Sequence, residues 1–292
     1  MKLALGPLQY YWSREKVFSF YKDMAEFPLD IVYLGETVCA RRHELREEDW
    51  FELADLLSSS GKEVVLSTQV LLESGAHLNA MHRIVENQRY TAEANDMGAV
   101  GMMDGRTPFV AGPHLNLYNP EALQIVAEEG AKRWVMPFEM SGVNLQKMLS
   151  RFPDNMESEV FVYGRLPLAY SARCFTARYH NLQKDSCQFR CLDYPDGLPV
   201  ETREEEPFLN FNGIQTQSIR IYNLINEIPQ MKSMGVDVVR LSPQSENMRG
   251  IVGCFREVID GATPSNGKIT AFMKGQPCNG YWYGNPGMNW QG

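Results

Sequence analysis

Residues 30–67 read DIVYLGETVCARRHELREEDWFELADLLSSSGKEVVLS and contain the unit from which the fold follows. Within it, Asp30–Leu34 is a short apolar run with strand character, Glu47–Ser59 has helical periodicity, and Glu63–Ser67 is a second strand-like run. A strand, a helix and a strand in succession imply a parallel strand pair joined by a right-handed crossover. The stretch therefore predicts an α/β fold.

The same alternation extends outward in both directions. Strand-like runs are also predicted at Leu3–Leu5, Ala99–Met103, Pro108–Ala111, Arg133–Pro137, Glu159–Gly164 and Val236–Leu241. Helices are predicted at Arg14–Glu26, Leu78–Glu93, Pro120–Glu129, Asn144–Arg151, Ile219–Ser233 and Glu246–Asp260. About eight strands over roughly 240 residues fit a TIM-like (β/α)8 barrel better than an open doubly wound sheet. The open sheet, which is the alternative, usually has a glycine-rich phosphate turn after its first strand, and this sequence has none.

Two regions interrupt the alternation. Residues 165–212 have no clean periodicity and hold three of the six cysteines, and an insertion of this length is usually functional or disordered. Residues 263–292 form a tail rich in Gly, Pro, Asn and aromatic residues, which we expect to be irregular and packed on the barrel. We therefore expect residues 1–292 to form one barrel domain with an insertion and a packed tail.

Charge and apolar patterning limit the classes of function. The chain has 28 Lys and Arg against 36 Asp and Glu, a formal net charge of −8, which argues against DNA and RNA as standing partners. No apolar run approaches the ~18–20 residues of a membrane span, so an integral membrane protein is not expected. The first residues lack a signal-peptide pattern, and we expect a cytoplasmic location.

The cysteines are too few for a disulfide scaffold in a chain of this length. Three of them are spaced Cys174-x12-Cys187-x3-Cys191, and Cys39 follows a predicted strand far upstream. Because the loops after barrel strands open on one face, Cys39 and the downstream group can converge there. The residues leave three readings open: structural thiols, an all-thiolate zinc site, or an iron–sulfur cluster. Cys254 and Cys278 are interpreted as packing thiols.

Other motifs are weak or absent. The sequence has no H-E-x-x-H, G-x-S-x-G, P-loop or G-x-G-x-x-G pattern, and no visible nucleophile–base pair of a peptidase. Polar residues at predicted strand ends are candidates for the lining of a pocket at the barrel mouth. The candidates are His114, Glu139 and Arg165, of which Arg165 could hold a carboxylate ligand through two parallel N–H bonds.

Several segments resemble the collagenase-like peptidase superfamily, and within it the branch that acts in oxygen-independent ubiquinone biosynthesis. They are Leu34–Cys39 (LGETVC), Leu166–Arg178 (LPLAYSARCFTAR) with Cys187 and Cys191, Asn212–Thr216 (NGIQT), Asp237–Pro243 (DVVRLSP) and Cys278–Trp282 (CNGYW). The resemblance covers essentially the whole chain, and the long cysteine segment is its most specific part.

The resemblance implies a [4Fe-4S] cluster bound by Cys39, Cys174, Cys187 and Cys191. It also implies a heterodimer with a UbiU-like sister subunit, assisted by a UbiT-like lipid-binding protein. Together these would hydroxylate the aromatic quinone ring precursor without oxygen, with prephenate as the oxygen donor. Related members hydroxylate bases in transfer and ribosomal RNA.

One stretch departs from the wider superfamily pattern E-x-F-x-H-G-A-L-C-x-x-x-S-G-x-C. Here Glu159–Pro167 reads EVFVYGRLP, so Tyr163 replaces the histidine and Pro167 replaces the first cysteine. The fourth cluster ligand must then come from elsewhere, and Cys39 is the available candidate. Three functions stay open: a hydroxylase subunit, a non-catalytic partner with a structural or redox cluster, and a peptidase or RNA-modifying enzyme.

Overall fold

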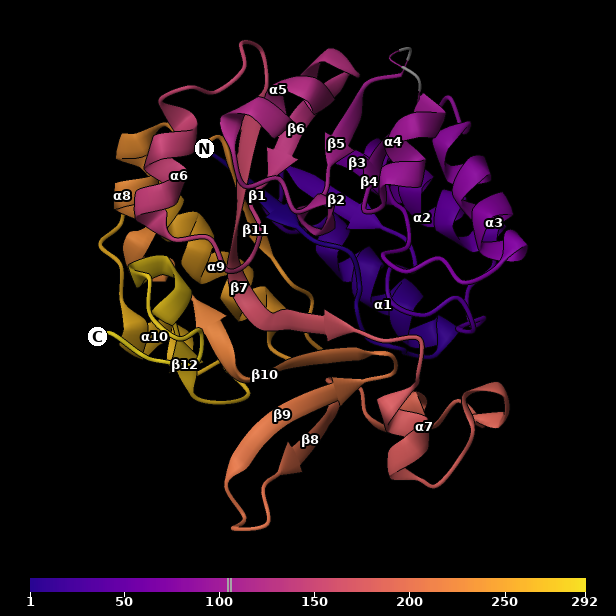
Figure 1. The fold of residues 1–292 in the computed structure, drawn as a ribbon. Helices are drawn as coiled ribbons and strands as arrows, with labels where there is room; N and C mark the ends of the chain where they lie inside the picture. Colours follow the sequence, from indigo (N-terminus) through magenta and orange to yellow (C-terminus); the bar gives the residue numbers. More distant parts are fainter. Residues whose placement is uncertain (104, 106) are drawn as a thin grey trace.

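The computed structural model describes residues 1–103, 105 and 107–292, and within them eight parallel strands close into a barrel (Figure 1). In order around the barrel they are β1 (Lys2–Leu5), β2 (Ile31–Leu34), β3 (Glu63–Ser67), β4 (Thr91–Ala94), β5 (Phe109–Ala111), β6 (Ala131–Val135), β7 (Glu157–Tyr170) and β11 (Val238–Leu241). The barrel closes because β11 pairs in parallel with both β1 and β7. The predicted TIM-like (β/α)8 barrel is confirmed.

Helices connect the strands and cover the outside of the barrel (Figure 1). They are α1 (Arg14–Ala25), α2 (Glu47–Ser59), α3 (Gly75–Val85), α4 (Met97–Met103), α5 (Pro120–Glu128), α6 (Gly142–Leu149), α8 (Ile228–Met234) and α9 (Met248–Ile259). Side-chain oxygens of Ser13, Asn119 and Ser141 accept backbone N–H bonds at helix starts, as N-cap residues do. Among the described residues, no helix has both the length and the apolar character of a membrane span.

One strand and one helix were predicted in the wrong places. Residues 99–103 form the end of α4 rather than a strand, and the fourth barrel strand is β4, which lies where the helix 78–93 was expected to end. The apolar run of α4 buries Ala99, Val100 and Met103 on one helical face. In β4, the inward position holds Glu93, which pairs with Arg240 inside the barrel. The sequence of β4 therefore lacks the apolar pattern by which a buried strand is predicted.

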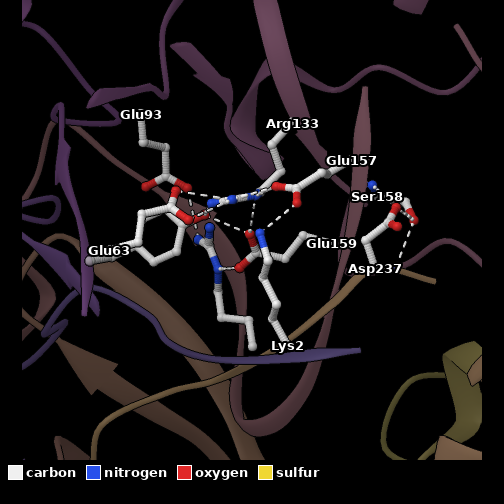
Figure 2. Close-up of polar contacts among 10 residues, drawn as sticks. Lys2, Glu63, Glu93, Arg133, Glu157, Ser158, Glu159 and Asp237 are labelled. Carbon is white, nitrogen blue, oxygen red and sulfur yellow. Dashed lines mark hydrogen bonds and ion pairs between the residues drawn. The ribbon is translucent and has the colours of Figure 1, made fainter. Parts of the chain in front are cut away.

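The barrel interior is partly filled by charged side chains that alternate inward along the strands. Arg240 donates from Nε to Glu159 Oε1 (2.6 Å) and from Nη1 to Glu93 Oε1 (2.7 Å), and its guanidinium lies 3.8 Å from the ring centroid of Tyr33. Arg133 contacts a second set of carboxylates toward the amino ends of the strands (Figure 2). Buried charges of opposite sign thus balance each other across strands far apart in sequence.

A sheet extends from one end of the barrel (Figure 1). The second half of β7 leaves the barrel and pairs antiparallel with β10 (Gln215–Asn223), followed by β9 (Pro207–Asn212) and β8 (Leu198–Glu201). The short helix α7 (Phe175–Tyr179) and the 3-10 turns η2 (Lys184–Ser186) and η3 (Arg190–Asp193) precede β8. We call residues 165–218 the extension.

The extension corrects two predictions. Residues 165–212 contain regular strands, and 219–233 is not one helix, because β10 runs to Asn223 and α8 begins at Ile228. Buried positions of β9 and β10 are occupied by amides, including Asn210, Asn212, Gln215 and Gln217, which bond to one another. An apolar alternation is therefore missing from strands that are nevertheless buried.

The C-terminal segment packs against the barrel helices. It contains α10 (Asn266–Thr270), β12 (Pro277–Cys278), which pairs in parallel with β10, and the 3-10 turn η5 (Gly280–Tyr283). Trp282 is buried, and a Cβ at Gly142 of α6 would lie 2.7 Å from its ring. Trp282 of the aromatic tail thus packs against α6.

Candidate functional site

Four cysteines from distant parts of the chain line one cavity. Cys39 lies in the loop after β2, Cys174 is the N-cap of α7, Cys187 ends η2, and Cys191 lies in η3. All four line a cavity with an empty volume of about 360 Å³ at the junction of barrel and extension. The barrel topology and the folded extension together produce this convergence.

Local contacts hold the cysteine backbones in place. Glu36 Oε1 accepts hydrogen bonds from the backbone N–H of Val38 (2.8 Å) and Cys39 (3.0 Å). The Sγ of Cys174 accepts from the N–H of Ala177 (3.4 Å), as a cap does. Gln188 and Phe189 both adopt left-handed backbone conformations at φ 51°, which non-glycine residues rarely do. This tight turn directs Cys187 and Cys191 toward the same cavity.

Arg41 and Arg42 line the cavity beside the thiols, as do Arg190 and Lys184. Arg42 is 6% exposed and donates from Nη1 to Gln9 O (2.6 Å) and from Nη2 to Asn212 Oδ1 (2.7 Å). Arg41 donates from Nη2 to Asp185 O (2.7 Å). The buried Nε groups of both arginines have no hydrogen-bond partner among the described residues. The two guanidinium groups already contact the carboxylates of Asp185 (3.3 Å) and Glu36 (3.5 Å), but their unpaired Nε–H donors beside four thiols fit an anionic group rich in sulfur acceptors.

Burial changes the acidity of the thiols. It raises the pKa of Cys39 and Cys174 and raises that of Cys191 to about 11, while the charge of Arg42 acts in the opposite direction. These three thiols are therefore protonated at neutral pH, and a metal group that bound them would have to displace their protons. In the part of the chain that the structure describes, no three His, Cys, Asp or Glu side chains are grouped to hold a single metal ion.

The other two cysteines lie elsewhere. Cys254 is buried in α9 and Cys278 is buried in β12, and neither lines the cysteine cavity. Burial raises the pKa of Cys278 to about 12. Their positions agree with the interpretation as packing thiols.

His114 lies at the mouth of the barrel. It lines a second cavity, of about 350 Å³ empty volume, together with Gln9, Glu93 and Arg240. Burial, and then the charge of Arg240, lower the pKa of His114 to about 3, so its imidazole is uncharged. Its Nε2 lies 3.5 Å from Tyr170 Oη.

The other two pocket candidates lie outside this cavity. Glu139 is exposed and bonds to the hydroxyl of Tyr118. Arg165 is buried in β7 and donates to the carbonyl oxygens of Ser218 (3.1 Å) and Ile219 in β10. Arg165 therefore faces a different groove, over β10.

Sequence reasoning missed a chain of amides that links the two cavities. Asn212 accepts from Arg42 and donates from Nδ2 to Gln215 Oε1 (2.9 Å), and Gln215 Nε2 donates to Tyr170 Oη (2.6 Å), which lies beside His114. A signal was present, because Asn212–Thr216 belongs to the segments that carried the resemblance. Arg240, a charged residue inside an otherwise apolar strand, was a second signal.

Comparisons with known proteins found a sequence relative and several solved structures that are similar to this chain. The chain is 30% identical over 168 residues to the tRNA hydroxylation protein P1 of Bacillus subtilis (strain 168), a match that covers 52% of this chain and 37% of the relative. This chain thus spans well under half of that relative. Among solved structures, it is similar to the U32 peptidase Mk0906 (TM-score 0.47, 12% identity, 84% of this chain and 94% of that one). It is also similar to tryptophan synthase from M. tuberculosis (TM-score 0.43, 12% identity, 94% and 93%).

The family assignment rests on a match along nearly the whole chain. The model of peptidase family U32 matches residues 16–290. This range includes the whole extension and every barrel strand except β1. The chain therefore belongs to peptidase family U32.

Proposed function

We propose that this chain is a UbiV-like iron–sulfur subunit of an oxygen-independent hydroxylation system in ubiquinone biosynthesis. The observation that carries the proposal is the convergence of Cys39, Cys174, Cys187 and Cys191 on one cavity that Arg41 and Arg42 also line. Membership in the U32 family and the hydroxylation named for the Bacillus relative support it. A UbiU-like subunit, a UbiT-like lipid-binding protein and prephenate as oxygen donor belong to the same proposal, as does a cytoplasmic location.

The residues of this chain would hold and shield a [4Fe-4S] cluster. The four thiolates would bind it, and when bound it would supply electron transfer. The unpartnered Nε–H groups of Arg41 and Arg42 would donate to its sulfur atoms and offset its negative charge. Glu36 keeps Cys39 oriented through the backbone, and Arg42 connects the cavity wall to the barrel at Gln9.

Metal analysis of the protein purified without oxygen tests the proposal. We expect about four iron and about four sulfide per chain, with the broad visible absorbance of an iron–sulfur protein. Each of the substitutions C39S, C174S, C187S and C191S should remove most of the iron. The matched control C254S changes a buried cysteine outside the cavity and should retain it.

Two results would contradict the proposal. Stoichiometric zinc without sulfide would replace the cluster by a structural metal site. Cysteine variants that lack iron but still support anaerobic ubiquinone synthesis would make the cluster structural, and the chain a non-catalytic partner. The complementation assay should use the chain co-expressed with its UbiU-like subunit.

RNA hydroxylation is the second candidate, because the Bacillus relative is named for it. The net charge of −8 argues against this chain as the main RNA-binding element. Loss of a hydroxylated transfer-RNA base on deletion of the gene, with ubiquinone unchanged, would favour this candidate. The opposite pattern would favour ubiquinone synthesis.

Ser245 and Lys274 form a candidate pair for peptidase chemistry, and the protonation of the lysine argues against it. Ser245 Oγ lies 2.9 Å from Lys274 Nζ, as in a serine–lysine pair. Burial lowers the pKa of Lys274, but its bonds to Asp196 and Glu246 outweigh this and raise it. The ammonium therefore stays protonated and cannot take the serine proton. The bonds of Ser245 and Lys274 to Asp196 instead tie the extension to the barrel.

A further inference from the structure

A groove lies on β10, away from the cysteine cavity. Its empty volume is about 800 Å³, and its lining includes Arg165 of β7, Arg220 of β10 and Lys274, which precedes β12. The pairing of β10 with β7 shifts register between Gln217 and Ile221, and two residues of this irregular stretch, Ile219 and Arg220, line the groove. Bulges often occur beside binding sites, where they redirect side chains.

Two of the three cations in this groove have no carboxylate partner. Arg165 is 8% exposed, yet its Nη1 donates only to the carbonyl oxygens of Ser218 and Ile219. Arg220 Nη1 donates to Met288 O (3.0 Å). No carboxylate among the described residues lies within 4.0 Å of either guanidinium.

Backbone carbonyl oxygens orient these guanidinium groups without cancelling their charge. Arginine remains protonated even when buried, and a buried charge without a counter-ion is costly. Lys274, in contrast, is neutralised by Asp196 (2.8 Å) and Glu246 (3.3 Å). The groove therefore carries two positive charges on guanidinium groups of fixed orientation. Among the residues that line it, the only carboxylate is that of the exposed Glu206.

We propose that this groove binds the phosphate group of a small organic phosphate ester. A phosphate monoester carries nearly two negative charges, which match two guanidinium groups, whereas a carboxylate carries one. The volume exceeds what an inorganic ion needs, and Pro207 and Ile219 offer apolar contacts to the organic part. The groove and the cysteine cavity share no lining residue, so this inference is independent of the proposed hydroxylation.

Calorimetric titration of the purified chain with phenyl phosphate tests the proposal. We expect saturable binding that weakens with added salt, and binding of benzoate at least tenfold weaker. The substitution R220Q should weaken phenyl phosphate binding about tenfold, since one charge-assisted contact is lost. The control R203Q removes the same charge from the exposed β8–β9 turn and should leave binding unchanged.

A second measurement needs no variant. Bound phenyl phosphate should slow the modification of Arg220 by phenylglyoxal, detected by mass spectrometry, while benzoate should not. Equal binding by R220Q and the unaltered chain, equal weakening in R203Q, or equal affinity for benzoate would each overturn the proposal. So would the absence of phenyl phosphate binding and of protection.

Discussion

At the scale of single residues, His114 makes the clearest prediction of a pH dependence. Its pKa is about 3 in the folded protein, against the ordinary value of 6.5. Between these values the unfolded chain binds one more proton than the folded chain, so stability must fall as the pH is lowered below about 6.5. The loss is at most about 1.4 kcal/mol per pH unit.

The substitution H114N should remove this contribution. Denaturant unfolding of both proteins at pH 7 and pH 4.5 should show the unaltered chain losing about 2 kcal/mol more than the variant. The groups that face His114, namely Arg240, Glu93 and Tyr170, are the same in both proteins. If both proteins lost the same stability between pH 7 and pH 4.5, His114 would have to become protonated in the folded protein, which would contradict the prediction.

The residues of the candidate site differ in how visible they were in the sequence. Spacing grouped Cys174, Cys187 and Cys191, and barrel topology placed Cys39 on the same face, which the shared cavity agrees with. Glu139 was chosen only because it follows a strand, yet the β6–α6 connection exposes it. Arg240 was missed because a charge in a buried strand has a meaning only once its partners, Glu93 and Glu159, are known.

At the scale of elements, β7 connects the barrel to the extension, and Gly164 allows it. Gly164 has φ 133°, and a Cβ there would lie 2.5 Å from Ser242 Cβ. The substitution G164A should therefore destabilise the protein by about 2–4 kcal/mol, through backbone strain and overpacking. The midpoint of urea unfolding measures this directly.

Gly253 in α9 has open space around its Cα, so G253A should be neutral or stabilising. An equal effect of both variants would refute the role of Gly164.

Helices and strands could be predicted from the sequence wherever their buried positions hold apolar residues. The bounds of α2 and β3 match the prediction residue for residue, because each buries a regular apolar set. β4 and the extension failed for one physical reason: their inward positions hold Glu93, which pairs with Arg240, and amides such as Gln215 and Gln217, which bond to the distant Gln9. A polar residue in a strand looks like surface until those partners are known.

At the scale of the whole molecule, the barrel and the extension share two strands and several polar contacts. β7 and β10 pair with each other along both parts. Trp12, just before α1, donates from Nε1 to Pro195 O (2.6 Å) in the extension. Gln9 accepts from Gln215 and Gln217, and Arg42 bonds to Asn212. Neither part can lose its structure without leaving buried polar groups of the other unpaired.

We therefore predict that residues 1–292 unfold in one cooperative transition. Far-ultraviolet circular dichroism, dominated by the barrel helices, should have the same urea midpoint as tryptophan fluorescence. W12F removes the tryptophan at the junction, and W134F removes one buried in the barrel strand β6. Within each variant the fluorescence and dichroism midpoints should still coincide, because each remaining set of tryptophans reports the same event. A fluorescence transition at lower urea that disappears in W12F but persists in W134F would show that the extension unfolds first.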